Sequence, residues 1–318
     1  MKILNTIGEQ FAPEGKEILV KLGEVVYSVP SQTDLLEQIG NYNVAFIGLG
    51  LNFHKDVLDA AKNLKVIVTA TTGLDHIDIE DTKKKGIEVL SLRGEEAFLN
   101  SISGTAELAL GLMIGLVRRI PWAFESVKRN EWHRDLFKGT TLQGKTLGIV
   151  GLGRLGRMMA RYGKALGMKV VFADPRDNSD YQRVSFEELI ETSDIISIHV
   201  HLLPETENMF NSSVFKKMKK TAVLINTSRG KIVDEEALLK VLNEEQIAGY
   251  ATDVLSDELS FKKYDNFKKY TDKDILVEYA KTHDNCLIVP HIGGNTIDSR
   301  IATDVFMAEK LARFLSSK

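Results

Sequence analysis

Residues 148–157 read GIVGLGRLGR, and this stretch decides the fold of the region around it. Gly151, Gly153 and Gly156 form a GxGxxG motif directly after an apolar run and directly before a segment with a helical pattern. A strand, a glycine turn and a helix in this order are typical of a dinucleotide-binding unit. The first glycine permits the tight turn, the second lets a pyrophosphate approach the backbone, and the third lets helix and strand pack closely.

An acidic residue at the end of the next apolar run supports this interpretation. Asp174 closes the run VVFAD at the spacing expected for an acid that accepts hydrogen bonds from the adenosine ribose. It favours NAD over NADP, because a 2'-phosphate would face a carboxylate. Arg154 and Leu155, at the start of the predicted helix, belong to the helix N-terminus that stabilises the bound anion.

Short β-rich runs alternate with helical patterns along the chain, which predicts an α/β fold with parallel sheets. Five such runs occur between residue 1 and about residue 95, and a second series extends from TLGIVGLG to CLIVP. A helical region from about 101 to 129, interrupted near Pro121, separates the two series. Two units agree with a length of 318 residues, and the last helical segment, from Thr296, is a candidate to return to the first unit.

The composition is that of a soluble globular protein and limits the partners. A net charge of -3 gives no electrostatic footprint for nucleic acid or an anionic membrane. The single cysteine, Cys286, allows neither an internal disulfide nor a cysteine-based zinc site, so a reducing cytoplasm fits best. The N-terminus does not have the pattern of a signal peptide.

Two other features have simple structural interpretations. The apolar window 102–117 contains Glu107 and is shorter than the roughly 20 residues that a membrane span needs, so it predicts a buried helix. His199 and His201 lack an evident third ligand, so no metal is expected.

Three polar residues follow apolar runs of the second series. Arg229 comes after VLIN, Glu258 after YATDV and His291 after CLIVP. Ligands of open α/β sheets bind beyond the carboxyl ends of the strands, so these side chains can converge near a nicotinamide. There Arg229 would bind the carboxylate and carbonyl oxygens of a 2-keto acid through paired hydrogen bonds, and His291 would donate a proton to the forming alkoxide. Glu258 would orient the imidazole and stabilise its protonated form. Taken singly, each has an ordinary interpretation as a capping, solvated or packed turn residue.

Several longer stretches occur in a fixed order along the chain. They are TTGLDHID (71–78), GKTLGIVGLGRLGR (144–157), SDIISIHVHLLPET (193–206), NTSRGKIVDEEAL (226–238) and PHIGGNT (290–296). With this series the chain resembles the NAD-dependent D-isomer-specific 2-hydroxyacid dehydrogenase family over nearly its whole length. The resemblance implies two doubly wound parallel-sheet domains: a central Rossmann NAD-binding domain (100–295), and a flavodoxin-like substrate-binding domain formed by both chain ends (1–99 and 296–318).

The resemblance also implies roles for particular residues. Arg229, Glu258 and His291 would be the catalytic set, and Thr227 and Asp253 would lie beside the nicotinamide. The backbone of Thr72, Gly73 and Leu74 would bind the substrate carboxylate together with Arg229. The helix at 102–117, with Trp122 and Trp132 beyond it, is similar to the region through which relatives form homodimers.

The predicted function is therefore NAD-dependent hydride transfer between a small 2-keto acid and its D-2-hydroxy acid in the cytoplasm. The alternative is an NADH-sensing binding protein on the same fold without significant turnover. Formate oxidation is disfavoured, because relatives that catalyse it typically carry glutamine where this chain has Glu258. Gly48 and Leu49 replace the Arg-Ser pair of phosphoglycerate-specific members, which puts a phosphorylated substrate in doubt. Asn52, His54 or Lys55 is the alternative group for binding a phosphate. In FKKYDNFKKY (261–270) the aromatic spacing predicts a surface helix, with a lid as the alternative.

Overall fold

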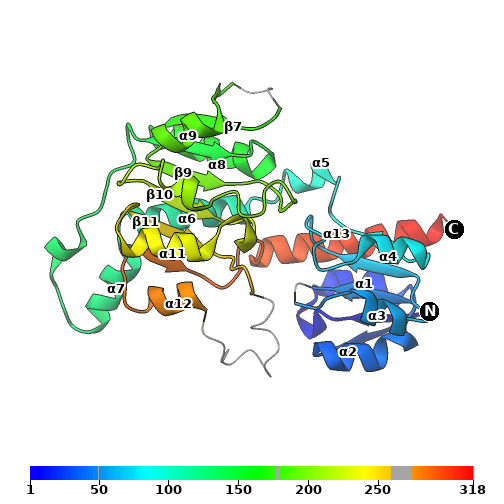
Figure 1. The fold of residues 1–318 in the computed structure, drawn as a ribbon. Helices are drawn as coiled ribbons and strands as arrows, with labels where there is room; N and C mark the ends of the chain where they lie inside the picture. Colours follow the sequence, from blue (N-terminus) through cyan, green and yellow to red (C-terminus); the bar gives the residue numbers. More distant parts are fainter. Residues whose placement is uncertain (49, 177–179, 259–273, 318) are drawn as a thin grey trace. The chain divides into compact units, whose positions relative to one another are not determined.

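The computed structural model describes residues 1–318 except 49, 177–179, 259–273 and 318. Within the described residues the chain divides into two compact units (Figure 1). The first contains Met1–Ile102 and residues 296–317, and the second contains Ser103–Glu258 and residues 274–295. The helix or lid expected for 261–270 lies outside the described residues.

The first unit is a five-stranded parallel sheet with the strand order β2-β1-β3-β4-β5. This is the flavodoxin-like order of doubly wound sheets, which confirms the predicted fold class. Its strands are β1 (Lys2–Asn5), β2 (Glu24–Tyr27), β3 (Val44–Ile47), β4 (Val66–Thr69) and β5 (Glu88–Leu90). Its helices are α1 (Pro13–Val20), α2 (Gln32–Gln38), α3 (Lys55–Ala60), α4 (Ile79–Lys84), α5 (Glu96–Leu99) and α13 (Ile297–Ser316), with short 3₁₀ turns at Gly8–Gln10 and Ile39–Asn41.

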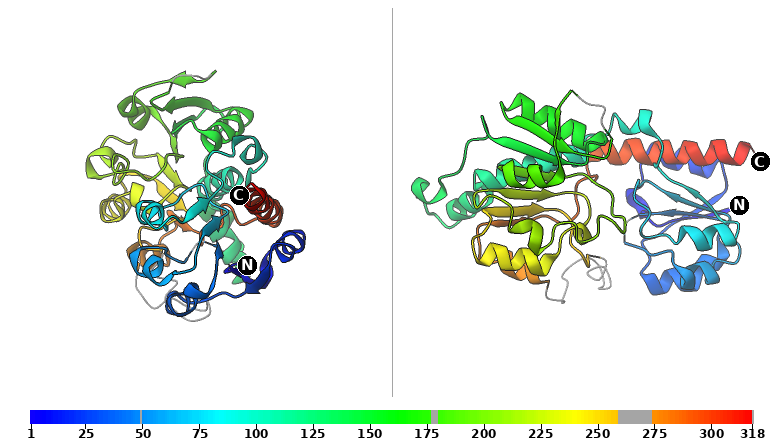
Figure 2. Two further views of the ribbon diagram at one scale, coloured as in Figure 1. Left: turned by 90° about the vertical axis from the view of Figure 1, so that its right-hand side faces the viewer. Right: turned by 45° about the horizontal axis from the view of Figure 1, so that its top comes forward.

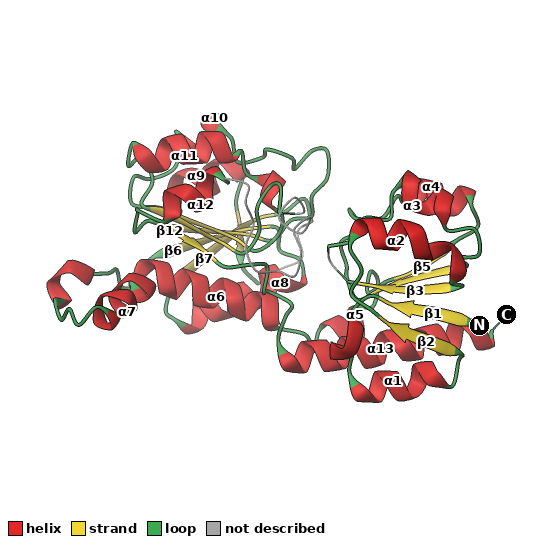
Figure 3. Ribbon diagram, turned by 90° about the horizontal axis from the view of Figure 1, so that it is seen from below, coloured by secondary structure: helices red, strands yellow, loops and turns green. Residues whose placement is uncertain are grey.

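Helices cover both faces of this sheet because its strands are apolar on both sides. Alternate residues of a strand point to opposite faces, so Ala45 and Ile47 enter one core cluster while Val44 and Phe46 enter the other. The first cluster is completed by α2 and α3, and the second by α1 and α13 (Figure 3). The C-terminal helix α13, red in Figure 2, thus packs beside α1 from the other end of the chain.

The second unit is a seven-stranded parallel sheet with the order β12-β11-β10-β9-β6-β7-β8. Numbered from β6, this is the 3-2-1-4-5-6 order of the Rossmann fold with one further strand, so the second part of the fold prediction is also confirmed. Its strands are β6 (Thr146–Val150), β7 (Lys169–Ala173), β8 (Gln182–Arg183), β9 (Ile195–Ile198), β10 (Val223–Asn226), β11 (Gly249–Thr252) and β12 (Cys286–Ile288). Its helices are α6 (Gly104–Val117), α7 (Ile120–Lys128), α8 (Arg154–Ala165), α9 (Phe186–Thr192), α10 (Ser212–Phe215), α11 (Glu235–Asn243) and α12 (Ile275–Ala280), with 3₁₀ turns at Arg134–Phe137 and Gly230–Ile232.

The apolar segment before this sheet forms a core helix. Among the described residues, Glu96–Val117 has the length and apolar composition of a membrane span. The structure divides it into α5 and α6, and α6 packs against β10, β11, β12 and α8 with Ala109 and Met113 fully buried. The helical region then breaks at Arg119, whose φ is 55°, and Pro121 lies in the first turn of α7, where its missing N–H costs nothing.

Candidate active site

The glycine turn has the geometry that a dinucleotide-binding loop requires. Gly151 follows β6 with a φ of +89°, a conformation that favours glycine. A Cβ on Gly156 would overlap the carbonyl oxygen of Gly151, so helix α8 approaches the turn too closely for any side chain. A Cβ on Gly153 would meet no atom within 4 Å, which leaves its backbone open to an approaching ligand. The turn therefore fits a pyrophosphate at the N-terminus of α8.

Arg154 and Leu155 begin α8 as expected, and both side chains are half-buried. Burial lowers the pKa of Arg154, although an arginine keeps its charge at neutral pH. The first turn of α8 contains no acidic residue, so nothing there opposes the binding of an anion.

Asp174 follows β7 and is tied to the glycine turn. Its Oδ2 accepts a hydrogen bond of 2.8 Å from the backbone N–H of Leu152, and its Oδ1 accepts one of 2.8 Å from the backbone N–H of Arg176. Burial opposes the charge, but these hydrogen bonds and the Arg176 guanidinium at 3.4 Å outweigh it and lower the pKa of Asp174. A carboxylate is thus held where the ribose acid of a dinucleotide site is expected.

The three strand-end residues follow three neighbouring strands. Arg229 lies after β10, Glu258 after β11 and His291 after β12, and the register pairs Asn226 with Thr252 and Thr252 with Ile288. The strands therefore end level, at the edge of the sheet where ligands of open α/β folds bind.

The structure brings His291 and Glu258 into direct contact, although 33 residues separate them. The imidazole Nδ1 lies 2.8 Å from Oε1 and 3.0 Å from Oε2 of the carboxylate, and both side chains are largely shielded from solvent. His291 has a φ of 42°, a left-handed conformation that non-glycine residues rarely adopt, and its N–H donates to the Asp253 carbonyl at 2.8 Å. Backbone strain of this kind is concentrated at functional sites.

The loop of Arg229 is fixed by the last residue of β10. The buried Asn226 side chain donates to the Arg229 carbonyl at 3.0 Å and accepts from the Ser228 N–H at 3.0 Å. The Arg229 guanidinium donates to the Ser228 carbonyl at 2.8 Å. Sequence analysis missed the role of Asn226, although its place at the end of a buried apolar strand was a signal.

Two predicted nicotinamide neighbours carry unsatisfied polar atoms. Asp253 and Thr227 are both buried, and Asp253 Oδ2 accepts from the Gly293 N–H at 2.8 Å. Among the described residues, Asp253 Oδ1 and Thr227 Oγ1 are inaccessible to solvent and have no hydrogen-bond partner. Burial also raises the pKa of Asp253. Buried polar atoms normally have partners, so these two fit a ligand that offers both a donor and an acceptor, as a carboxamide does.

The predicted substrate-binding residues Thr72, Gly73 and Leu74 lie in the first unit, in the loop after β4. The Thr71 hydroxyl donates to the Gly73 carbonyl at 2.8 Å, and Arg93 Nε donates to the Thr72 carbonyl at 3.2 Å. Sequence analysis did not select Arg93, although this residue follows β5 just as the predicted loop follows the neighbouring strand β4. The role of this loop in substrate binding stays a prediction.

Of the two histidines after β9, His199 forms a hydrogen bond within the strand end. His199 Nε2 lies 2.8 Å from the Ser197 hydroxyl, and burial lowers the pKa of His199 to about 4, so the ring is neutral near pH 7. The Nδ1 atom of the His199 ring is inaccessible to solvent, whereas the residue as a whole is half-buried. No group of three or more potential metal ligands occurs in the described part of the chain.

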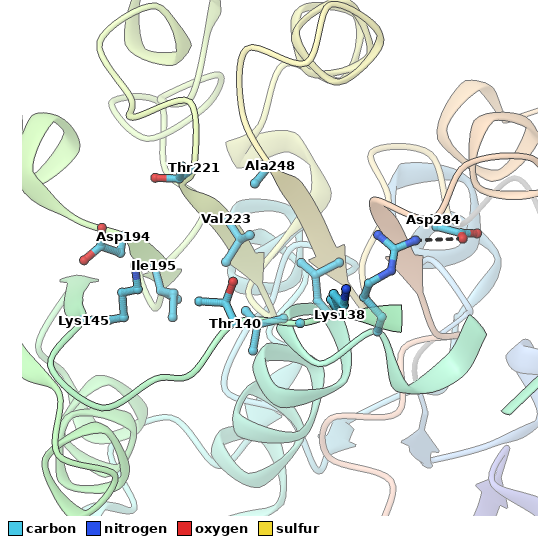
Figure 4. A pocket seen from close by; sticks show the side chains of 13 residues that line it. Lys138, Thr140, Lys145, Asp194, Ile195, Thr221, Val223, Ala248 and Asp284 are labelled. Carbon is cyan, nitrogen blue, oxygen red and sulfur yellow. Dashed lines mark hydrogen bonds and ion pairs between the residues drawn. The ribbon is translucent and has the colours of Figure 1, made fainter. Parts of the chain in front are cut away.

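A cavity of about 240 Å³ lies at the amino ends of strands β9, β10 and β11, away from the predicted site at the carboxyl ends (Figure 4). Its walls include Asp194, Thr221 and Ala248, which directly precede β9, β10 and β11 or lie one residue further back. The ion pair between Arg119 and Asp284 lines it as well. Because the strand-end residues lie at the carboxyl ends, this cavity is separate from the candidate active site.

Comparisons with known proteins agree with the geometry. The family model described as "D-isomer specific 2-hydroxyacid dehydrogenase, NAD binding domain" matches residues 110–293. The chain is 32% identical over 295 residues to a hydroxypyruvate reductase of Thermotoga maritima, covering 92% of this chain and 91% of that protein. It is 36% identical over 307 residues to a D-3-phosphoglycerate dehydrogenase of Methanocaldococcus jannaschii. This match covers 94% of this chain but only 55% of that protein.

Solved structures show the same similarity. A D-lactate dehydrogenase of Aquifex aeolicus, crystallised with NAD and lactic acid, superposes with a TM-score of 0.87 at 29% identity. The match covers 100% of this chain and 96% of that protein.

Proposed function

Because the chain belongs to the D-isomer specific 2-hydroxyacid dehydrogenase family, a family of NAD-dependent oxidoreductases, we propose that it interconverts a small 2-keto acid and its D-2-hydroxy acid. The observation that carries this proposal is the His291–Glu258 pair, which follows β12 and β11, and β11 lies next to β10, the strand that Arg229 follows. NAD(H) is the cofactor, which the open backbone at Gly153 and the unsatisfied atoms of Thr227 and Asp253 would hold.

The hydrogen bonds of His291 determine which nitrogen carries the reacting proton. Nδ1 is engaged by the Glu258 carboxylate at 2.8 Å, so Nε2 is the nitrogen left to give a proton to the substrate oxygen. Glu258 stabilises the doubly protonated ring before transfer and fixes its orientation. In the reverse direction the same Nε2 accepts the proton of the hydroxy acid.

Arg229 would bind the substrate by its carboxylate. A guanidinium forms two parallel hydrogen bonds with a carboxylate, which fixes both position and orientation. When bound, NADH would supply the hydride to the carbonyl carbon of a substrate that Arg229 and His291 hold. Asp174 favours NADH over NADPH, because its charged carboxylate would repel a 2'-phosphate.

The decisive experiment is an NADH oxidation assay with glyoxylate, hydroxypyruvate, pyruvate, bulkier 2-keto acids and 3-phosphohydroxypyruvate. Relatives named for glyoxylate and hydroxypyruvate motivate the first two substrates. We expect turnover with at least one unphosphorylated acid. Tight NADH binding without turnover on any of them would contradict the proposal and favour the NADH-sensing alternative.

Variants of Arg229 test the mechanism. Removing the guanidinium in Arg229→Ala should lower kcat/KM by at least about 100-fold, since two charge-assisted hydrogen bonds are lost. The matched control is Arg161→Ala, which removes an exposed arginine on α8. Near-normal kcat/KM in Arg229→Ala would contradict the assigned role.

We further propose a homodimer formed through α7 and the residues after it. Ile120, Phe124, Trp132 and Leu136 are between 51% and 85% exposed, although all are large and apolar. Large apolar side chains exposed this close together along the chain favour an interaction site, and a second copy of the chain is the partner that the family suggests. A cytoplasmic location fits the single buried cysteine, Cys286.

A further inference from the structure

We propose that Glu235 is a positioning residue for the reaction, because its carboxylate holds the turn that presents Glu258 to His291. This inference rests on the proposed function. Glu235 itself is the first residue of α11 and touches neither the imidazole nor, in the proposed mechanism, the substrate.

Hydrogen bonds at the two ends of the backbone turn 255–258 connect Glu235 with the imidazole. Glu235 Oε1 accepts a hydrogen bond of 2.8 Å from the backbone N–H of Ser256. Ser256 lies inside the turn that the Glu258 N–H closes on the Leu255 carbonyl at 3.5 Å. Glu258 then places its carboxylate 2.8 Å from His291 Nδ1. The closing bond of the turn is long, so the hydrogen bond that the Ser256 N–H donates to Glu235 is the stronger restraint on this backbone.

The same turn is packed against the loop of Arg229. A Cβ on Gly230 would overlap the Leu255 carbonyl group and the Ser256 nitrogen, so the two backbones are in direct contact there. Glu235 holds the turn from the side of α11, and Gly230 lets the arginine loop close on it. A shift of this turn would therefore displace Glu258 and would also loosen the contact beside Arg229.

The surroundings of Glu235 show that its carboxyl group is placed for this contact. Burial raises the pKa of Glu235, the hydrogen bond from the Ser256 N–H lowers it, and the nearby Asp274 and Asp257 raise it again. Burial and acidic neighbours both disfavour a charged glutamate, so the hydrogen bond to Ser256 is what makes the position acceptable.

A purely local role is the competing explanation, because acids in the first turn of a helix stabilise it. Glu236 provides the matched control, since it occupies the same first turn but is exposed. If the helix alone required the charge, both positions would behave alike on substitution.

The kinetic test compares E235A, E235Q and E236A in the full chain. E235A should lower kcat by about 10-fold to 100-fold, since small misplacements of a catalytic group have costs of this size. KM for NADH should change by less than about twofold, because the glycine turn is untouched. E235Q keeps an oxygen that accepts from Ser256 and should recover most of the loss, whereas E236A should match wild type. Wild-type kcat in E235A, or an E235Q variant as slow as E235A, would overturn the proposal.

A double-mutant cycle separates positioning from general destabilisation. Because Glu235 acts through Glu258, adding E235A to E258Q should cost much less than E235A costs alone. Fully additive losses would overturn the proposal.

A spectroscopic measurement makes the outcome independent of turnover. The His291 Nδ1 proton, assigned by its disappearance in H291N, should give a downfield proton NMR signal in wild type, because it is hydrogen-bonded to a carboxylate. We expect E235A to weaken or shift this signal and E236A to leave it unchanged. An unchanged signal in E235A overturns the positioning role even if no 2-keto acid is turned over, whereas absent turnover with a shifted signal overturns only the proposed function.

Discussion

Replacing Gly156 by alanine tests whether the glycine turn depends on close helix–strand packing even without a ligand. The new Cβ would overlap the Gly151 carbonyl oxygen and lie 3.1 Å from Cγ2 of Ile149. Neither neighbour can move at low cost, since the oxygen belongs to the backbone of the tight glycine turn and Ile149 is completely buried. We therefore expect Gly156→Ala to lower the free energy of unfolding by about 1–3 kcal/mol in the absence of NADH.

Gly153→Ala is the matched control, because it adds the same methyl group three residues earlier. No atom lies within 4 Å of the new Cβ, and the φ of -71° suits alanine. The free energy of unfolding should change by less than about 0.5 kcal/mol. NADH binding should weaken by at least about tenfold, equivalent to about 1.4 kcal/mol, because the methyl group would stand where the pyrophosphate approaches.

Two measurements on each variant separate these effects. Urea unfolding without NADH measures the change in the free energy of unfolding that results from packing. Calorimetric titration with NADH measures the change in the affinity for the cofactor. A Gly156→Ala variant as stable as wild type would refute the packing argument. A Gly153→Ala variant that binds NADH as tightly as wild type would refute the assignment of the pyrophosphate to this turn.

Four further predictions concern other parts of the molecule. Asp174→Asn should raise the ratio of kcat/KM for NADPH to that for NADH by at least about tenfold, because the charge facing a 2'-phosphate is removed; an unchanged ratio contradicts its role. Burial lowers the pKa of His199 to about 4 from 6.5, so the unfolded chain binds more protons between these values. The contribution of His199 to the free energy of unfolding should therefore be present above pH 6.5 and be lost as the pH falls, which lowers this free energy by about 2 kcal/mol at pH 5 relative to pH 7. Urea unfolding should show that this difference is absent in His199→Asn. Asp304→Ala leaves the Ala12 N–H, now bound at 3.0 Å, without its acceptor and should cost about 1–3 kcal/mol in urea unfolding; no loss means that water replaces the carboxylate. Trp132→Glu should convert a dimer into monomers by light scattering, and a variant that remains dimeric would exclude this surface as the interface.

The local pattern of the sequence was sufficient to locate the strands that the candidate site residues follow. The runs 223–226 and 249–252 are strands of a doubly wound sheet, which is buried on both faces, so every residue in them is buried and most are apolar. Strand β8 was not predicted, because Gln182 and Arg183 are exposed at the edge of the sheet and give no apolar pattern. The helix break expected near Pro121 falls at Arg119, because proline is well tolerated in a first turn.

The glycine motif, Asp174, and the order of Arg229, Glu258 and His291 along the chain could be identified from sequence, because each depends on neighbours within a few residues or on family motifs. A partnership of His291 with Glu258 was expected from the family motifs, and the tertiary structure adds its geometry, with Nδ1 2.8 Å from Oε1. The left-handed backbone at His291 and the hydrogen bond from the Ser256 N–H to Glu235 came only from the tertiary structure. These contacts depend on which strands are neighbours and on how long loops fold back over the sheet. Packing between distant segments decides both, and no periodicity within a single segment records it.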